Sequence, residues 1–225
     1  MTFLKVIRWM VWKDLISEVR SRETISSMFF FALIVILVFS FSFSMDQQAA
    51  RELIAGIIWV AFVFTGIIGL GRSFSVELQN DCLEFLQMSP ASKGAMYLGK
   101  VMANLIFMLT VEIILFPMFV IFFNLDVIEE IHILLLIFFL ATFGLSAVGT
   151  LFSALTVQIR AREVMLPILL LPLVVPVMIA AVEATKGAHN GDPLAGYWQW
   201  LELLAIFNVV FTVVSFWMFE FVMDS

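Results

Sequence analysis

Six long stretches without a single Lys, Arg or Asp constrain this chain more than any other feature of its sequence. About 20 consecutive apolar residues let an α-helix cross the hydrocarbon core of a membrane, and a helix satisfies its backbone hydrogen-bonding groups within itself. The stretches are 24–45, 53–71, 101–125, 131–156, 164–182 and 203–219. The pattern therefore predicts an all-α, polytopic membrane protein with six transmembrane helices.

The composition leads to the same fold class. Hydrophobic residues make up 63% of the chain and charged residues 13%, and the mean hydropathy is +1.09. A soluble globule of this composition would leave a large apolar area in contact with water. Six spans and short loops account for the length, so residues 1–225 are expected to form one transmembrane domain without an ATPase domain of its own.

Residues 1–23 are predicted to form an amphipathic helix that lies in the membrane interface. Five basic residues make this stretch too charged to cross lipid. Between positions 11 and 20, apolar and polar side chains separate onto two faces of a helical wheel. The apolar face carries Val11, Trp12, Leu15, Ile16 and Val19, and the polar face carries Lys13, Asp14, Ser17, Glu18 and Arg20. The following run is long and Phe-rich, unlike a signal peptide, so no cleavage is expected.

Residues 72–100 form the one long polar segment between apolar stretches, and we expect a soluble partner to bind there. Acidic residues recur in it at helical spacing beside apolar ones, which predicts a helix with one acidic and one apolar side. These residues are Glu77, Asp81, Leu83, Glu84, Phe85 and Leu86. Pro90 disfavours the helical conformation at the residue before it, so this helix is expected to end there and a second one to begin near Ala91.

The basic residues predict how the chain is oriented in the membrane. With the N-terminus in the cytoplasm, ten of the twelve Lys and Arg residues lie on the cytoplasmic side of six spans, and only Arg51 and Lys186 lie outside. Such an excess of positive charge is typical of cytoplasmic loops. Both termini are therefore expected in the cytoplasm.

Glu112 is the acidic residue inside a predicted span, five residues before Pro117. A carboxylate at membrane depth is energetically unfavourable and faces protein or water. Two interpretations stay open: Glu112 lines a transport path or acts as a protonatable switch, or it is a carboxyl group hydrogen-bonded to a neighbouring helix.

Two further patterns concern helix packing. Small residues recur on one face of 131–156, where they favour close approach of another helix, within one bundle, at a dimer seam or along a substrate path. They are Thr142, Ser146, Gly149, Thr150 and Ser153. The prolines at 167, 172 and 176 remove three backbone donors, so the fifth span is expected to be bent or broken.

Signals for enzymatic chemistry are weak. Residues 66–73 imitate a phosphate-binding loop but end an apolar run, without the strand that such a loop follows. His132 and His189, both on the predicted outer side, are candidate haem ligands or ordinary polar residues. No catalytic constellation or metal-ligand spacing is found, and no catalytic or metal site is predicted.

Several separated motifs resemble a known family. Glu77, Leu83-Glu84, Leu86, Ser89-Pro90, Lys93 and Gly99-Lys100 are similar to the coupling segment of ABC-2 type permeases. Lys13-Asp14-Leu15, Leu70 to Phe74, and Arg160, Arg162 and Glu163 running into Leu166-Pro167 resemble the haem exporter protein B family. The resemblance covers nearly the whole chain, although Asp81-Cys82 stands where a small residue or glycine is expected.

The resemblance implies a permease subunit in a bacterial inner membrane, with residues 72–100 as the cytoplasmic coupling segment. It implies a homodimer that works with a separate ATPase, the A subunit of the cytochrome c maturation system, and with its C and D subunits. ATP would be hydrolysed by the partner and would drive either haem export or release of the haem-loaded periplasmic chaperone. Haem would then be a candidate substrate, and the chaperone an indirect partner. No cofactor of its own and no nucleic acid is expected, whereas membrane lipid is.

Three alternatives stay open. The chain is an ABC-2 permease for another substrate, a secondary transporter, or a scaffold that transports nothing and transmits the ATPase stroke to neighbouring subunits. A secondary transporter is expected to have coupling-ion residues and internal repeats, whereas this sequence has one intramembrane acid and no clear repeat.

Overall fold

A computed structural model describes residues 2–42, 47–74, 77–78, 82, 86, 88–125, 127, 129–159 and 161–224, without the side chains of residues 21, 47–52 and 224. These residues form seven α-helices. Their bounds are α1 Phe3–Ser21, α2 Glu23–Ser42, α3 Gln47–Arg72, α6 Lys93–Phe123, α7 Ile131–Thr156, α8 Arg162–His189 and α9 Leu194–Asp224. All except α1 are long and apolar enough to span a membrane, which confirms the prediction of an all-α protein with six spans.

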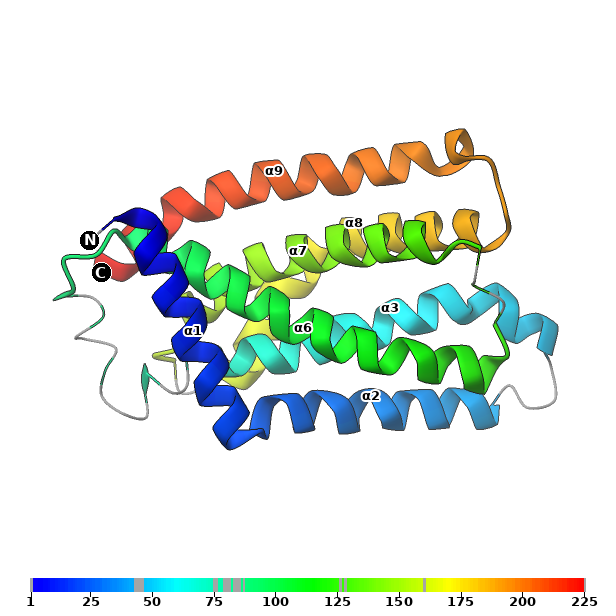
Figure 1. Cartoon of the computed structure of the whole chain (residues 1–225), viewed down its shortest axis with the longest axis horizontal. Helices are drawn as coiled ribbons and strands as arrows, with labels where there is room; N and C mark the ends of the chain where they lie inside the picture. Colours follow the sequence, from blue (N-terminus) through cyan, green and yellow to red (C-terminus); the bar gives the residue numbers. More distant parts are fainter. Residues whose placement is uncertain are drawn as a thin grey trace.

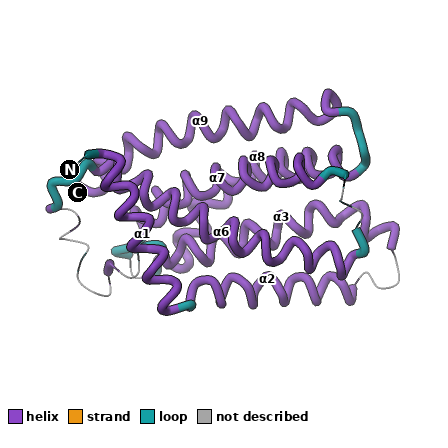
Figure 2. Tube along the Cα trace, viewed as in Figure 1, coloured by secondary structure: helices purple, strands orange, loops and turns teal. Residues whose placement is uncertain are grey.

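The six long helices run side by side along one axis, and α1 lies across one end of the bundle (Figure 1). Both chain termini lie at that end, which we call the terminal end, and the opposite one is the far end. Among the described residues no strand occurs, and those that are not helical form loops and turns at the two ends of the bundle (Figure 2). An even number of spans requires termini on the same side, so this arrangement agrees with the predicted topology.

Helix α1 has the position expected of an interfacial helix, but its packing differs from the two-faced helical wheel. Val6, Met10 and Glu18 are buried against the bundle. Of the apolar face drawn from the sequence, Trp12 and Val19 are exposed, whereas Val11, Leu15 and Ile16 are half-buried. Exposed aromatic and aliphatic side chains on a charged helix suit the boundary between lipid and water.

The turn from α1 to α2 explains why the carboxylate of Glu18, near the end of the interfacial helix, is buried. Arg22 takes a left-handed conformation with φ of 55° and ends α1, and its backbone N–H donates to the Glu18 carbonyl at 2.7 Å. The Glu18 side chain then accepts a hydrogen bond from the Ile25 N–H at 2.9 Å. This bond satisfies one of the donors that the first turn of a helix leaves unpaired.

Helix α7 forms the interior of the bundle through its small residues. A side chain at Gly149 would begin only 2.2 Å from Leu70 of α3. The Ser146 hydroxyl donates to the Val101 carbonyl of α6 at 2.8 Å, and the Ser153 hydroxyl donates to the Leu70 carbonyl at 2.6 Å. The small-residue face therefore packs against α3 and α6 of the same chain.

Two boundaries differ from the sequence prediction. The third long helix begins at Lys93 instead of residue 101 and includes Lys100, whose side chain is satisfied inside the protein. The fifth span was expected to be bent or broken; it forms one helix, Arg162–His189, with all three prolines inside it, so it is not broken. Each proline removes one backbone N–H donor, but the residues on both sides of it continue the helix.

Candidate functional site

Four charged residues from three parts of the chain meet at the terminal end. Lys100 of α6 has a side chain only 1% exposed. Its Nζ lies 2.6 Å from Glu77 Oε1 and 3.1 Å from Asp14 Oδ2 of α1, and it donates to the Ser73 carbonyl at 2.7 Å. A buried ammonium group requires partners of this kind, because an unpaired charge in the interior is strongly unfavourable.

Lys13 of α1 completes the group, which we call the charge cluster: Lys13, Asp14, Glu77 and Lys100. Lys13 Nζ donates to Glu77 and lies 2.8 Å from Asp14 Oδ1. Two ammonium groups and two carboxylates give no net charge. The cluster therefore holds the beginning of the polar segment, at Glu77, against both the interfacial helix and α6.

Each charge in the cluster stabilises the ionised form of its neighbours. Burial acts to raise the pKa of Glu77, but the charges of Lys100 and Lys13 outweigh burial, so this pKa lies below its ordinary value. Burial acts to lower the pKa of Lys13, but Asp14 and Glu77 outweigh it, so that pKa lies above its ordinary value. Both side chains are therefore charged at neutral pH.

A neutral hydrogen-bonded chain extends the cluster into the bundle. The Asn104 amide of α6 donates to the Ser73 hydroxyl and to the Thr150 hydroxyl of α7, both at 2.9 Å. The Thr150 hydroxyl in turn donates to the Ser146 carbonyl at 2.7 Å. The first residues after α3 are thus bonded directly to α1 and α6, and through Asn104 of α6 to α7.

The structure corrects two of the residues expected on the surface of the polar segment. Glu77 was predicted on an exposed acidic face, but it is buried because Lys13 and Lys100 pair with it. Leu86 was predicted on a free apolar edge, but it is half-buried and packs against the core at the terminal end. The remaining helix residues, Asp81, Leu83, Glu84 and Phe85, lie outside the described residues.

Other side chains of this segment do face outward. Pro90 is exposed, as expected for a residue after the predicted helix. Met88 is 81% exposed, and the sequence analysis did not single it out. A large apolar side chain so open to water at the terminal end, beside an exposed Pro90, is suited to contact with another protein.

Glu112 forms a second polar site, deeper in the bundle. Its carboxylate is buried, and Oε1 accepts a hydrogen bond from the Thr142 hydroxyl of α7 at 2.7 Å. Oε2 has no hydrogen-bond partner among the described residues. The structure thus supports the interpretation of Glu112 as a carboxyl group hydrogen-bonded to a neighbouring helix. Its partner, Thr142, lies on the small-residue face of α7. Pro117 follows inside the same helix.

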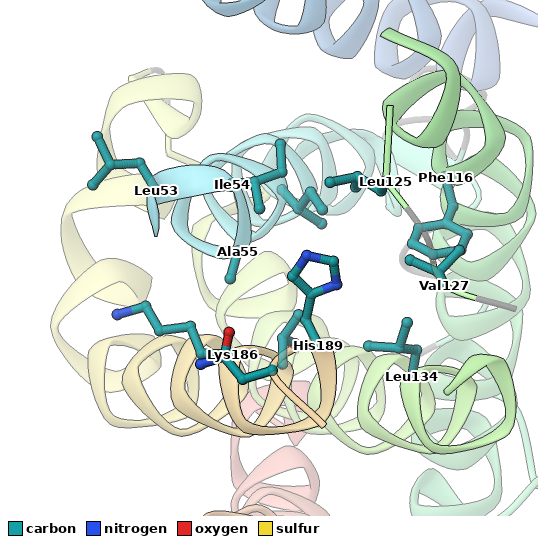
Figure 3. Close-up of a pocket in the computed structure, with 12 residues that line it drawn as sticks. Leu53, Ile54, Ala55, Phe116, Leu125, Val127, Leu134, Lys186 and His189 are labelled. Carbon is teal, nitrogen blue, oxygen red and sulfur yellow. The ribbon is translucent and has the colours of Figure 1, made fainter. Parts of the chain in front are cut away.

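A cavity of about 670 Å³ opens at the far end between α3, α6, α7 and α8. Its walls are mostly apolar, and His189 and Lys186 of α8 project into it (Figure 3). His132, the other candidate haem ligand, is exposed and does not line this cavity. The ammonium group of Lys186 is paired with Glu183 at 2.8 Å, so the His189 imidazole, with Thr185 and Asn190, supplies the remaining polar groups among the lining residues.

The motif around Arg160 contributes to a separate cavity at the terminal end. Arg162 and Pro167 line it together with the exposed Glu163. Arg160 lies outside the described residues. Leu166, one residue before Pro167, is 1% exposed and anchors this part of α8 in the core.

Fold and site together define a class: a multi-pass α-helical membrane protein whose polar segment is fixed to its interfacial helix by buried ion pairs. The sequence profile of the CcmB protein family matches residues 2–222. The chain belongs to this family.

Curated relatives carry the name heme exporter protein B. The protein from Pseudomonas aeruginosa is 30% identical over 193 residues, which cover 86% of this chain and 86% of that protein. The protein from Escherichia coli K12 is 34% identical over 195 residues, which cover 84% of this chain and 87% of that one. The protein from Haemophilus influenzae is 29% identical over 196 residues. The similarity thus covers most of each protein, as the resemblance of the motifs led us to expect.

Proposed function

We propose that this chain is the membrane subunit of an ABC transporter complex for cytochrome c maturation. It couples ATP hydrolysis by a separate ATPase subunit to haem export or to release of the haem-loaded periplasmic chaperone. The names of the relatives support the link to haem. The observation that carries the coupling role is the charge cluster, because it joins the polar segment rigidly to two helices.

Transmission of force follows from this geometry. A partner that pushes on the polar segment displaces Glu77, and Glu77 cannot move away from Lys100 and Lys13 without leaving buried charges unpaired. The push therefore moves α6 and α1 together with the segment. The bond from Thr142 to Glu112 joins α6 to α7 in the middle of the bundle, so α7 follows.

The ATPase contact belongs to the outward side of the same segment. Met88 and Pro90 are two of its exposed described members. Asp81, Leu83, Glu84 and Phe85 are assigned to the contact from the sequence alone. Apolar side chains in a cleft of the partner would supply affinity, and the carboxylates would fix orientation.

We place the terminal end in the cytoplasm of a bacterial inner membrane. The described basic residues of α1, of the end of α3 and of the beginning of α6 gather there, whereas Lys186 lies at the far end. A reporter fused after Ser225, or inserted near Ala91, is expected to be active only in its cytoplasmic form. Periplasmic activity at either position contradicts this orientation.

The proposed complex contains a second copy of this chain, the A-subunit ATPase, the haem-handling C subunit and the small D subunit. Haem export and chaperone release differ in whether haem touches this chain. The far-end cavity provides a test, because it is lined by His189 and histidine is a common ligand of haem iron. If haem passes here, His189→Ala shifts the haem absorption band of the purified complex, and if the chain only transmits force, the band is unchanged.

Complementation tests the proposed function as a whole. A strain that lacks this chain should make no covalent c-type cytochromes, and the intact chain should restore them on a haem-stained gel. Restoration should require an ATPase subunit able to hydrolyse ATP. Normal c-type cytochromes in the deletion strain, or restoration with an inactive ATPase, would refute the proposal.

A further inference from the structure

A second large cavity lies at the terminal end, apart from the charge cluster and from the far-end cavity. It measures about 700 Å³ and lies between α2, α3 and α8, with the end of α1 beside it. Both α2 and α8 pack on α3, so α3 forms its floor. The volume falls within the range of about 300 to 1,000 Å³ that is usual for small-molecule sites.

We propose that this cavity binds one phospholipid whose headgroup carries a phosphate and a primary ammonium group, as phosphatidylethanolamine does. We call it the lipid cavity. The inference does not depend on the coupling role or on haem, since none of the four charge-cluster residues lines this cavity.

The position of the lipid cavity matches the depth of lipid headgroups. Glu23 begins α2, Arg72 ends α3 and Arg162 begins α8, and all three residues line the cavity. The ends of three membrane-spanning helices mark the level at which hydrocarbon gives way to headgroups. The charged rim of the cavity therefore lies where a lipid carries its own charges.

The deeper wall is apolar and suits acyl chains. It is formed by Phe31 of α2, by Phe64, Ile67 and Ile68 of α3, and by Leu166 and Pro167 of α8. Phe64 is 39% exposed, so this wall is open towards the surroundings of the bundle. A lipid chain could therefore lie along α3 without crossing the protein interior.

Arg162 supplies the phosphate site. Its Nη1 atom is buried and has no hydrogen-bond partner among the described residues. A buried guanidinium N–H without an acceptor is energetically unfavourable, and the oxygens of a phosphate can accept two parallel hydrogen bonds from the fork of an arginine. Arg72, on the facing helix, is 2.9 Å from Glu23 and has a half-exposed side chain, so it is available for the same phosphate.

The carboxylates on the rim select the ammonium group. Glu18, Glu23 and Glu163 line the lipid cavity with the two arginines, so its ionised side chains are negative by one charge. A headgroup with net negative charge is therefore disfavoured, whereas a zwitterion places its phosphate at the arginines and its ammonium at a carboxylate. Glu163 is exposed in the first turn of α8. Of the three carboxylates it is the nearest in sequence to Arg162, so we assign the ammonium group to it.

Lipid retention on the purified protein tests the proposal. The chain is reconstituted in nanodiscs of equal parts phosphatidylethanolamine, phosphatidylglycerol and phosphatidylcholine, transferred to detergent, and its bound lipids are measured by native mass spectrometry. We expect one retained phosphatidylethanolamine. Arg162→Gln should reduce its retention about tenfold, the effect of losing one charge-assisted hydrogen bond, whereas Lys186→Gln at the far end should not.

A second variant separates lipid recognition from a loss of folding. Glu163→Ala should keep the lipid but remove the preference for phosphatidylethanolamine over phosphatidylcholine, because it removes the acceptor of the primary ammonium group, whereas the quaternary ammonium of phosphatidylcholine donates no hydrogen bond in either case. Equal retention of the three lipids by the intact chain would overturn the proposal. So would retention unaffected by Arg162→Gln, or a second copy of the chain in the cavity, detected as a disulfide between two Ile68→Cys chains in a Cys82→Ser background.

Discussion

The substitution Lys100→Met tests the charge cluster most severely. Methionine keeps the length and apolar stem of lysine but removes the ammonium group. Lys100 is 1% exposed, and Glu77 and Asp14 are 6% and 12% exposed, so the variant leaves two poorly hydrated carboxylates with only Lys13 between them. Lys13 is 45% exposed and is the weaker partner.

The expected loss of stability is about 3 to 5 kcal/mol, the range for removing one partner of a buried ion pair. The double variant Lys100→Met with Glu77→Gln should lose less, since it leaves no unpaired carboxylate at position 77. Lys186→Met is the matched control. Lys186 pairs with Glu183 at 2.8 Å with both side chains about 40% exposed, and an exposed pair contributes about 0 to 1 kcal/mol.

Unfolding in mixed micelles, followed by circular dichroism and tryptophan fluorescence, measures these differences. Equal stability of the Lys100→Met and Lys186→Met variants would refute the reasoning, because a buried, satisfied charge and an exposed one would then contribute alike. A double variant less stable than Lys100→Met would also refute it.

The pH dependence of the intact chain has a defined sign. The lowered pKa of Glu77 contributes stability that is present above the ordinary value of 4.5 and is lost as pH falls through the folded pKa. The raised pKa of Lys13 contributes stability that is present below 10.5 and is lost as pH rises through the folded pKa. Unfolding curves should therefore be nearly constant between these limits, and the Lys100→Met variant should lose less on acidification below pH 4.5.

Two further predictions concern the interior. Glu112→Gln should retain the Thr142 hydrogen bond and normal maturation, whereas Glu112→Ala should lower the stability by about 1 to 3 kcal/mol, because it leaves the Thr142 hydroxyl unpaired. Haem-stained gels measure maturation and unfolding curves measure stability. Equal behaviour of the two variants would contradict the assignment. Gly149→Ala should cost about 1 to 3 kcal/mol because its Cβ would meet Leu70. Gly56→Ala, with nothing within 4 Å of its Cβ, should instead be neutral or slightly stabilising, and a loss equal to that of Gly149→Ala would contradict the packing.

The sequence was sufficient to predict the six spans, because lipid tolerates few charges and the charge-free runs are long. For the same reason it began the third span at residue 101, although it also predicted a helix from near Ala91; both belong to one helix, α6, that begins at Lys93. Lys93 and Lys100 mark a polar region when the sequence is considered by itself, but Lys100 is neutralised by Asp14 and Glu77, residues 86 and 23 positions away. No window along the chain reveals partners at such separations.

The charge cluster illustrates the same limit for the site. Helical spacing correctly drew attention to Glu77, but spacing describes only one element, and it assigned this residue to a solvent-facing side. Lys13 and Asp14 stood in the predicted polar face of α1, where they could equally have faced water. Opposite charges in two separate polar regions of an otherwise apolar chain, residues 1–23 and 72–100, were the available signal. This signal indicates pairing without specifying which residues pair.

Binding of the ATPase to the polar segment is the central claim, and Met88→Asp tests it most directly. Met88 is 81% exposed, so the change should leave the bundle folded while it places a charge in the proposed contact. The control is Leu4→Asp on α1, where the side chain is 77% exposed at the same end of the molecule. We predict that the ATPase co-purifies with the intact chain and with the Leu4→Asp variant, and that its yield with Met88→Asp falls about tenfold or more, as expected for a charge buried without a partner. Undiminished ATPase with Met88→Asp, together with normal ATP-dependent maturation, would contradict the account.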